Sequence, residues 1–149
     1  MTTLQVGDLA PDFNSVDQDG NAISLQQFKG KKLVLYFYPK DNTPTCTVEA
    51  CNIRDNYARF LAQGYAVAGV SPDTAASHKK FTTKFDLPFT LIADADKTIV
   101  NAYKVYGPKK FMGKDTIGVY RTTFVIDETG KIEKIITDVK SKEHADQIL

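Results

Sequence analysis

Compact apolar runs alternate along the chain with stretches in which apolar residues recur at helical spacing. The segments KLVLYFY, residues 32–38, and YAVAGVS, residues 65–71, are rich in aromatic and branched side chains. Runs of this length without polar alternation predict strands that are buried on both faces, as parallel strands are. FTLIAD, residues 89–94, is a third expected strand.

A helix is predicted directly after the first of these strands. Thr43 suits the N-cap, and Pro44 suits the first helical position. Apolar side chains then recur with a helical period at Ala50, Ile53, Tyr57, Phe60 and Leu61. Gly64 is expected to end this helix.

Three further helices are expected along the chain. Ser71, Asp73 and Thr74 offer N-caps for a short helix that ends near Phe85. The segments ADKTIVNAYKVY, residues 95–106, and SKEHADQIL, residues 141–149, predict two more.

Two hairpins complete the pattern. One turns at Asp19-Gly20, a strong hairpin signal between short apolar pieces. The other joins RTTFVID, residues 121–127, to KIEKIITDV, residues 131–139. Strands that alternate with helices and then form a hairpin indicate an α/β fold with a central mixed sheet flanked by helices.

Composition places few further limits on the function. The 149 residues fit one domain, 1–149, with 42% hydrophobic and 25% charged residues. A net charge of +1 gives no reason to expect a nucleic-acid or membrane partner. The N-terminal stretch lacks a basic start and a continuous apolar run, and the chain has no apolar segment of about 18 residues, so the cytoplasm is the expected compartment.

Neither histidine is expected to take part in chemistry. His78 and His144 are each flanked by Lys or Glu, which favours a surface position over a ligand or base. The lysine pairs at 79–80 and 109–110 are interpreted as solvated faces. Two cysteines are too few for a structural zinc site unless other ligands converge on them, so no metal is expected.

The two cysteines, Cys46 and Cys51, are the candidate reactive groups. With Thr43 at the N-cap, Cys46 lies in the first helical turn, where free backbone N–H groups and the helix dipole favour negative charge. The thiolate is the reactive form of cysteine, and such positions favour it. In α/β sheets sites also gather at the carboxyl ends of parallel strands, and Cys46 follows Pro39, where the first strand ends, by seven residues.

The spacing of the cysteines bears on whether they can bond. In a regular helix, residues five apart have Cα atoms roughly 8.6 Å apart, whereas a disulfide needs less than about 7 Å. A disulfide between Cys46 and Cys51 therefore requires the first turns to unwind, which removes a few hydrogen bonds of about 1 kcal/mol each. A thiolate that attacks a peroxide becomes a sulfenic acid, and a second thiol can condense with it.

The segment YFYPKDNTPTCTVEAC, residues 36–51, resembles the active-site segment of peroxiredoxins. It carries the PxxxTxxC pattern, and its CTxEAC continuation is similar to the bacterioferritin comigratory protein or peroxiredoxin Q subfamily. RTTFVID and the N-terminal GDLAPDF, residues 7–13, match further segments of the family in order and spacing. The resemblance implies a thioredoxin-like fold with an N-terminal β-hairpin extension.

The resemblance also implies roles for five residues. Cys46 is expected to be the peroxidatic nucleophile, while Thr43 and Arg121 hold the peroxide oxygens and stabilise the thiolate. Pro39 is expected to shield the pocket from water, and Glu49 to orient the arginine. From their sequence context alone, Arg121 and Glu49 would be solvated surface residues and Pro39 the end of a strand.

In this subfamily a cysteine five positions after the nucleophile often acts as the resolving thiol, and Cys51 occupies that place. The implied reaction reduces hydrogen peroxide and organic hydroperoxides without a cofactor, and thioredoxin or a similar dithiol is the implied reductant. The subfamily favours a monomer, with a dimer as the alternative.

Several alternatives stay open at this point. Cys46 could be an inert core thiol, and Cys51 a packed bystander. A protein dithiol–disulfide oxidoreductase is one alternative function, although the five-residue spacing argues against it, and a non-enzymatic peroxide sensor is another. Tyr38, Phe111 and Met112 could line a pocket, but packing is their default interpretation.

Overall fold

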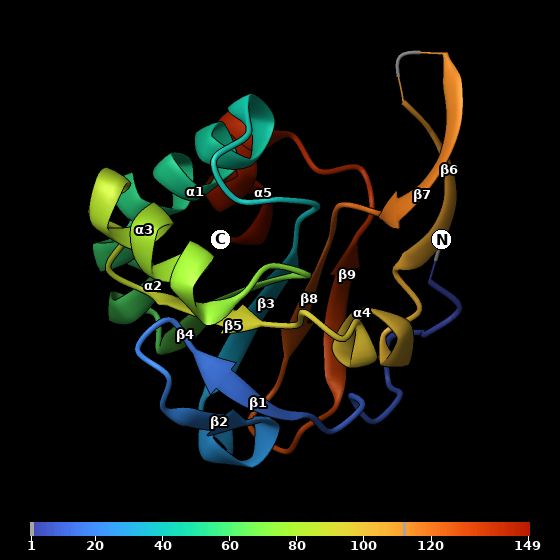
Figure 1. Ribbon diagram of the computed structural model, residues 1–149. Coiled ribbons are helices and arrows are strands. Elements are labelled where there is room, and N and C mark those ends of the chain that lie inside the picture. Colours follow the sequence, from blue (N-terminus) through green and yellow to red (C-terminus); the bar gives the residue numbers. More distant parts are fainter. Residues whose placement is uncertain (1, 112) are drawn as a thin grey trace.

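A mixed sheet of seven strands forms the centre of the protein (Figure 1). The computed structural model describes residues 2–111 and 113–149, with the backbone alone of Phe111; Met112 and the Phe111 side chain, two of the candidate pocket walls, lie outside this description. The strand order is β2-β1-β5-β4-β3-β8-β9. The bounds are β1 Asn14–Asp17, β2 Ala22–Ser24, β3 Lys32–Phe37, β4 Tyr65–Ser71, β5 Thr90–Ala93, β8 Thr122–Ile126 and β9 Ile132–Ile136.

Three parallel strands occupy the middle of the sheet. β3 pairs in parallel with β4, and β4 with β5, whereas β8, β9 and the hairpin β1–β2 are joined to them in antiparallel register. The predicted strand 65–71 and both predicted hairpins are confirmed. The N-terminal hairpin extends the sheet, because β1 pairs with β5.

Alternate residues of β3 face two separate cores. Leu33, Leu35 and Phe37 belong to one apolar cluster, and Val34 and Tyr36 belong to the other. This two-sided burial is why the segment carries no polar alternation.

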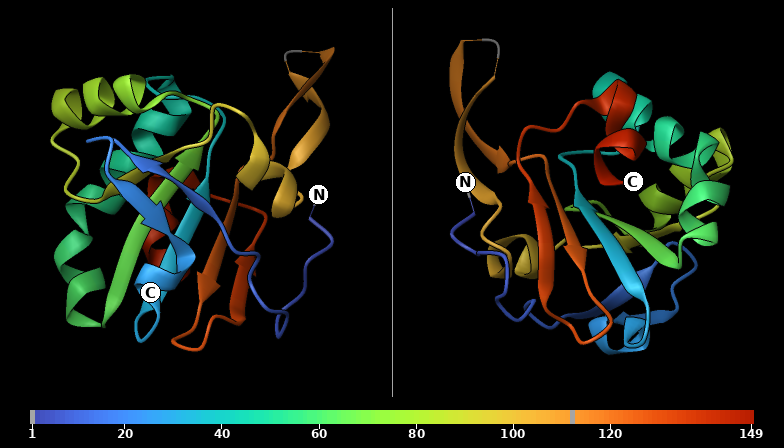
Figure 2. Two further views of the ribbon diagram at one scale, coloured as in Figure 1. Left: turned by 60° about the horizontal axis from the view of Figure 1, so that its bottom comes forward. Right: turned by 180° about the vertical axis from the view of Figure 1, so that it is seen from behind.

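Helices cover both faces of the sheet (Figure 2). One face is covered by α1 (Pro44–Asp55), α2 (Tyr57–Ala62), α3 (Ala75–Phe85) and α5 (His144–Ile148), and the other by α4 (Thr98–Ala102). Short 3-10 turns, η1 (Leu25–Phe28) and η2 (Ser141–Glu143), precede β3 and α5 respectively. Within the described residues, no helix has the length and apolar character needed to cross a bilayer.

The expected helix from Pro44 to Gly64 is wrong in one respect, because it is divided at Asn56. The Asn56 backbone leaves helical geometry, with ψ at 10°, and its side-chain amide donates to the Asn52 carbonyl at 2.8 Å. The apolar period continues across this break and so conceals it. The helix expected over residues 95–106 is likewise shorter, and α4 ends at Ala102.

A two-stranded arm, for which the sequence pattern provides no prediction, projects from the body beside the sheet (Figure 1). It consists of β6 (Tyr106–Phe111) and β7 (Lys114–Val119), paired with each other in antiparallel register. Gly107, Pro108 and the lysine pair at 109–110 interrupt the apolar alternation by which a strand is usually detected.

Both histidines are buried, so their expected surface position is wrong. His78 in α3 and His144 in α5 each have 0% of their area exposed. Their charged neighbours along the chain lie on other faces of the helices, because successive helical residues point about 100° apart.

Candidate functional site

Cys46 lies at the start of α1, immediately beyond the carboxyl end of β3. Thr43 is the N-cap residue with extended backbone (φ −92°, ψ 156°), Pro44 follows it, and the Thr47 N–H donates to the Thr43 carbonyl at 2.9 Å. The Cys46 side chain is 2% exposed. The expected place of Cys46 in the first helical turn is confirmed.

The Thr43 side chain does not cap the helix. Its hydroxyl donates to the Lys40 carbonyl at 3.0 Å, and no side-chain bond to the first-turn N–H groups is made. No side-chain cap therefore occupies the N–H groups of the first turn, and this end of the helix favours an anionic group.

Arg121 connects the sulfur to a carboxylate. Its Nη2 donates to Cys46 Sγ at 3.2 Å, and its Nη1 donates to Glu49 Oε1 at 2.6 Å. The antiparallel pairing of β3 with β8 brings Arg121 here, because Thr122 lies opposite Phe37. Burial opposes the charge of Arg121, but Glu49 and then Cys46 raise its pKa above the ordinary value.

Glu49 lies one helical turn behind the sulfur and has 0% of its area exposed. Burial raises the pKa of its carboxyl to about 7, and the attraction of Arg121 opposes that rise. Oε1 accepts the Arg121 bond, whereas Oε2 is buried and has no hydrogen-bond donor. The carboxyl thus has one oxygen on the arginine and one unsatisfied oxygen in the interior.

A groove of about 690 Å³ opens beside Cys46. Pro39, Thr43, Cys46 and Arg121 all line it, so the structure brings four of the six sequence-predicted residues to one cavity. Residues of β6 and β7 form the opposite wall. Glu49 is not among the lining residues and reaches the site only through Arg121.

Cys51 lies apart from this groove. It is half-buried, it is not among the lining residues, and both cysteines are free thiols within an intact α1. The structure therefore does not bring Cys51 to Cys46, as expected for a regular helix.

The arm contributes residues that sequence reasoning missed. The sequence pattern predicts a solvated face for Lys109, whereas in the structure Lys109 lines the groove and its Nζ donates to the Val119 carbonyl at 2.8 Å. Burial and then Arg121 lower its pKa, and Cys46 opposes that change. Tyr106 and Ile117 lie in the same wall, and no sequence signal relates this arm to the cysteine. Among the described residues that line the groove, none carries a carboxylate.

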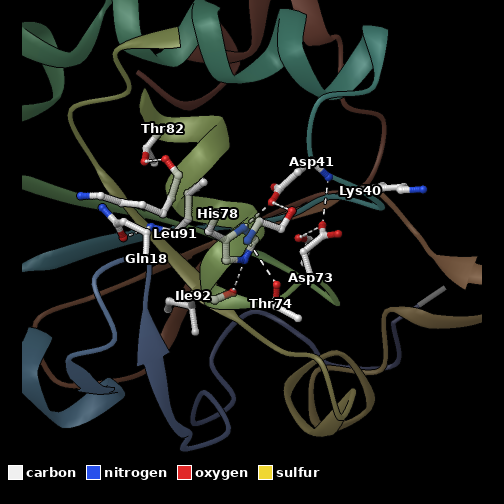
Figure 3. Close-up of polar contacts among 12 residues, drawn as sticks. Gln18, Lys40, Asp41, Asp73, Thr74, His78, Thr82, Leu91 and Ile92 are labelled. Carbon is white, nitrogen blue, oxygen red and sulfur yellow. Dashed lines mark hydrogen bonds and ion pairs between the residues drawn. The ribbon is translucent and has the colours of Figure 1, made fainter. Parts of the chain in front are cut away.

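One group of side chains has the donor types of a metal site. Ligand atoms of Asp41, Asp73 and His78 lie within 4.8 Å of one another. His78 Nδ1 is 2.7 Å from Asp41 Oδ2, and the Asp41 backbone N–H donates to Asp73 Oδ2 at 2.9 Å (Figure 3). These donors and acceptors satisfy one another, which fits a hydrogen-bonded network better than a cation site.

The same network anchors the loop that precedes α1. Tyr38 donates to Asp41 Oδ1 at 2.6 Å and Ser77 donates to Asp41 Oδ2 at 2.8 Å, so Asp41 links the end of β3 to α3. Thr43 lies two residues beyond Asp41. The network therefore restrains the loop that carries one of the groove-lining hydroxyls.

Comparison with known proteins gives a consistent family relationship. Residues 6–135 match the model of the AhpC/TSA family. The putative peroxiredoxin bcp of Helicobacter pylori strain J99 is 46% identical over 149 residues, covering 100% of this chain and 98% of that protein. Peroxiredoxin Bcp of Escherichia coli K12 is 42% identical over 149 residues, covering 100% of this chain and 96% of that protein.

Solved structures show the same relationship at the level of the fold. Peroxiredoxin Q of Xanthomonas campestris has a TM-score of 0.87 at 32% identity, covering 99% of this chain and 93% of that one. A peroxiredoxin Q mutant of Xylella fastidiosa has a TM-score of 0.92 at 30% identity, covering 99% and 94%. The thioredoxin-like fold implied by the sequence resemblance is thereby confirmed.

Proposed function

Because the chain belongs to the AhpC/TSA family of peroxiredoxins, with full-length relatives of the Bcp type, we propose that its thiol peroxidase chemistry starts at Cys46. The observation that carries this assignment is the Arg121 guanidinium, 3.2 Å from Cys46 Sγ, inside a groove that also contains Thr43. A fixed cation beside a sulfur stabilises the thiolate and the charge that develops on a departing oxygen.

In the first step the Cys46 thiolate attacks one oxygen of the hydroperoxide. The S–O bond forms as the O–O bond breaks, the sulfur is oxidised to a sulfenic acid, and the other oxygen leaves as an alkoxide or hydroxide that takes up a proton. Arg121 and the Thr43 hydroxyl hold the two oxygens, and Pro39 limits the access of water to them. Glu49 orients Arg121 through the bond of 2.6 Å between Nη1 and Oε1.

In the second step Cys51 resolves the sulfenic acid. Its thiol displaces the hydroxyl of Cys46–SOH as water, and a disulfide forms between the two sulfurs. Both residues belong to the helix Pro44–Asp55, so the first turns of α1 have to unwind. A dithiol such as thioredoxin then reduces the disulfide by exchange and returns both thiols.

The groove is consistent with organic hydroperoxides as well as hydrogen peroxide. Its walls include Pro44, Pro72, Ile117 and Val119, which offer apolar surface to an alkyl chain. A bacterioferritin comigratory protein of Xanthomonas campestris has been studied for its alkyl peroxide reduction activity in trapped intermediate and ligand complexes. That protein is 31% identical to this chain, with a TM-score of 0.87.

We further propose that residues 1–149 act as one domain, since β1 pairs with β5 and β9 pairs with β8 in one sheet. A monomer in the cytoplasm is the proposed working form, with a dimer as the alternative.

One experiment tests both chemical steps. One equivalent of hydrogen peroxide is added to reduced protein, and the intact mass is recorded over seconds. A rapid loss of two hydrogens is expected from a disulfide between Cys46 and Cys51. In Cys51→Ser, a gain of one oxygen that persists is expected instead.

The other outcomes separate the alternatives. An unchanged mass would exclude the peroxidase proposal. A persistent gain of oxygen in the unmodified protein would leave Cys46 reactive but remove the resolving role of Cys51. A sensor would react with peroxide once but would not turn over with thioredoxin and its reductase.

A further inference from the structure

His144 is a buried titratable residue for which the proposed reaction has no role. It lies in α5, which packs against α1 (Figure 2). Its Nε2 is 2.6 Å from Thr123 Oγ1 and 3.6 Å from Glu49 Oε2, the carboxylate oxygen without a donor. The C-terminal helix thus reaches the carboxyl that holds Arg121.

The hydrogen bonds of Gln147 determine which His144 nitrogen carries a proton. Gln147 Oε1 accepts from the Lys140 N–H at 2.9 Å, and its Nε2 donates to the Asp138 carbonyl at 2.8 Å, so the amide has one orientation. The same Oε1 lies 2.8 Å from His144 Nδ1. Because an amide oxygen can only accept, Nδ1 carries a hydrogen.

In neutral His144 the second nitrogen, Nε2, is therefore an acceptor. Thr123 then donates to it, and Glu49 Oε2 faces the ring without a hydrogen between the two atoms. Two buried acceptors that face each other are unfavourable, and one added proton on either atom removes the conflict. Burial lowers the pKa of His144 and raises that of Glu49 to about 7, so a proton on the pair titrates in the neutral range.

Other charged groups act on the pair from the elements around it. Arg121 before β8 faces both residues, and Lys134 of β9 acts on His144. Cys46 of α1 and the Tyr36 hydroxyl of β3 lie on the Glu49 side. Burial, followed by Glu49 and Cys46, raises the pKa of Tyr36 well above its ordinary value, so this hydroxyl stays neutral.

We propose that His144 is a positioning residue for the peroxidase reaction: the buried pair of His144 and Glu49 binds one proton, and this proton determines how much of the Arg121 charge is available to Cys46. The inference rests on the proposed role of Cys46. With the proton, the pair is neutral whichever atom holds it; without the proton, the pair carries one negative charge beside Arg121.

The sign of the effect on the rate follows from this charge. When pH rises through the titration of the pair, the Glu49 carboxylate neutralises Arg121, and the thiolate and departing oxygen lose stabilisation. The rate constant for peroxide is therefore expected to fall as the pair loses its proton.

The titration of the His144–Glu49 pair can be measured in a variant that does not react with peroxide. In Cys46→Ser, the Glu49 carboxyl carbon and the His144 ring nitrogens are followed by NMR between pH 5 and 9. One proton on the coupled pair predicts that both signals change at one midpoint, between about pH 6 and 8, as coupled groups do. Two separate midpoints, with Glu49 titrating below about pH 5, would overturn the inference and leave the peroxidase proposal intact.

The effect on the reaction is tested with His144→Gln. Glutamine is long enough to place an amide N–H near the position of Nε2, so it can donate to Glu49 Oε2 without titrating. In this variant, the rate constant for hydrogen peroxide is expected to show no decline at alkaline pH. At pH 6 it is expected to be several-fold lower than that of the unmodified protein. The ultraviolet absorbance of the thiolate, followed across the same pH range, separates the ionisation of Cys46 from that of the pair.

Asp146→Asn is the matched control in the same helix. It removes the exposed ion pair with Arg59, whose Nη1 is 3.1 Å from Asp146 Oδ1, and it leaves the buried pair intact. Its pH profile is expected to match that of the unmodified protein. An alkaline decline that persists in His144→Gln, or that is equally lost in Asp146→Asn, would contradict the proposed role.

Discussion

At the scale of single residues, the site depends on how Arg121 divides its hydrogen bonds. One terminal nitrogen contacts the Cys46 sulfur and the other contacts the Glu49 carboxylate. The guanidinium fork suits this arrangement, because its donors are held in a plane and its charge persists at all accessible pH values. A lysine could supply the charge but could not hold both partners in the same geometry.

Arg121→Gln is expected to lower the rate constant of Cys46 with hydrogen peroxide by about 10²-fold, because a preorganised cationic donor to the reacting atoms is lost. Competition with a reporter peroxidase measures this rate constant. Arg59→Gln, which alters an exposed arginine of α2, is the control and should stay within about twofold. Equal rates for Arg121→Gln and the unmodified protein would contradict the role of the guanidinium.

Glu49 should make the stability of the protein depend on pH. Its folded pKa of about 7 lies above the ordinary value of 4.5, so between these values the native state binds more protons than the unfolded state. The free energy of unfolding therefore falls as pH rises from about 4.5 to 7. Each pH unit corresponds to about 1.4 kcal/mol, which limits the total to about 3 kcal/mol.

Urea denaturation of the unmodified protein and Glu49→Gln at pH 5 and pH 8 measures this contribution. The decline in stability between the two pH values should be smaller in Glu49→Gln. Glu133→Gln, which alters an exposed pair with Lys32, should keep the original decline. Identical pH dependence in all three proteins would show that Glu49 is ionised in the native state throughout this range.

At the scale of elements, the C-terminal half of α1 is joined by hydrogen bonds to the segment before α5 and to the end of α3. The Asn52 side chain donates to the Lys142 carbonyl at 2.9 Å and accepts from the Ala145 N–H at 2.8 Å. Arg54 Nη1 donates to the Phe85 carbonyl at 2.7 Å. Both anchors lie beyond Cys51, so the unwinding that a disulfide requires is confined to the turns before them.

Oxidation by peroxide should therefore remove the protection of backbone amides from hydrogen exchange within residues 47–51, while the amides of β3 stay protected. Mass spectrometry of peptic fragments measures the difference between the reduced and the oxidised protein. In Cys51→Ser the same treatment should leave α1 protected, because no disulfide forms. Retained protection in the oxidised unmodified protein would argue against a bond between Cys46 and Cys51.

At the scale of the whole molecule, the arm of β6 and β7 converts the end of the sheet into a groove. Both strands of the arm contribute residues to the groove that Cys46 lines. Ile117 of β7 lies in this wall with 64% of its area exposed, so an alkyl chain in the groove could cover it. The arm is therefore where discrimination among hydroperoxides is expected.

Ile117→Ser should raise the KM for a bulky apolar hydroperoxide such as cumene hydroperoxide by up to about tenfold, because an apolar contact is worth about 1 to 3 kcal/mol. Hydrogen peroxide is too small to reach this wall, so its rate constant should not change. Leu61→Ser alters an exposed apolar residue of α2 that does not line the groove, and it should affect neither substrate. A KM for cumene hydroperoxide that is unaltered in Ile117→Ser would exclude the arm as a substrate contact.

Local sequence patterns were sufficient wherever the interaction that determines the structure is short in range. The strand over residues 65–71, the hairpin at Asp19-Gly20 and the start of α1 at Thr43-Pro44 follow from neighbouring residues alone. The position of Cys46 in a first helical turn follows for the same reason. The likeness to peroxiredoxins then provided Arg121, which the local pattern could not distinguish from a surface arginine.

Contacts between distant parts of the chain were decided only by the tertiary structure. Glu49 and His144 lie close together although they are 95 residues apart in the sequence, and Lys109 lines the groove only because the arm folds beside it. The local hydrophobic periodicity around these residues therefore does not predict either contact. The break at Asn56 was concealed because the apolar spacing continues through it. Sequence alone thus determined the central strands and the place of Cys46 in a first helical turn, through propensity and capping, whereas the contact of Glu49 with His144 and the shape of the groove depend on packing between elements.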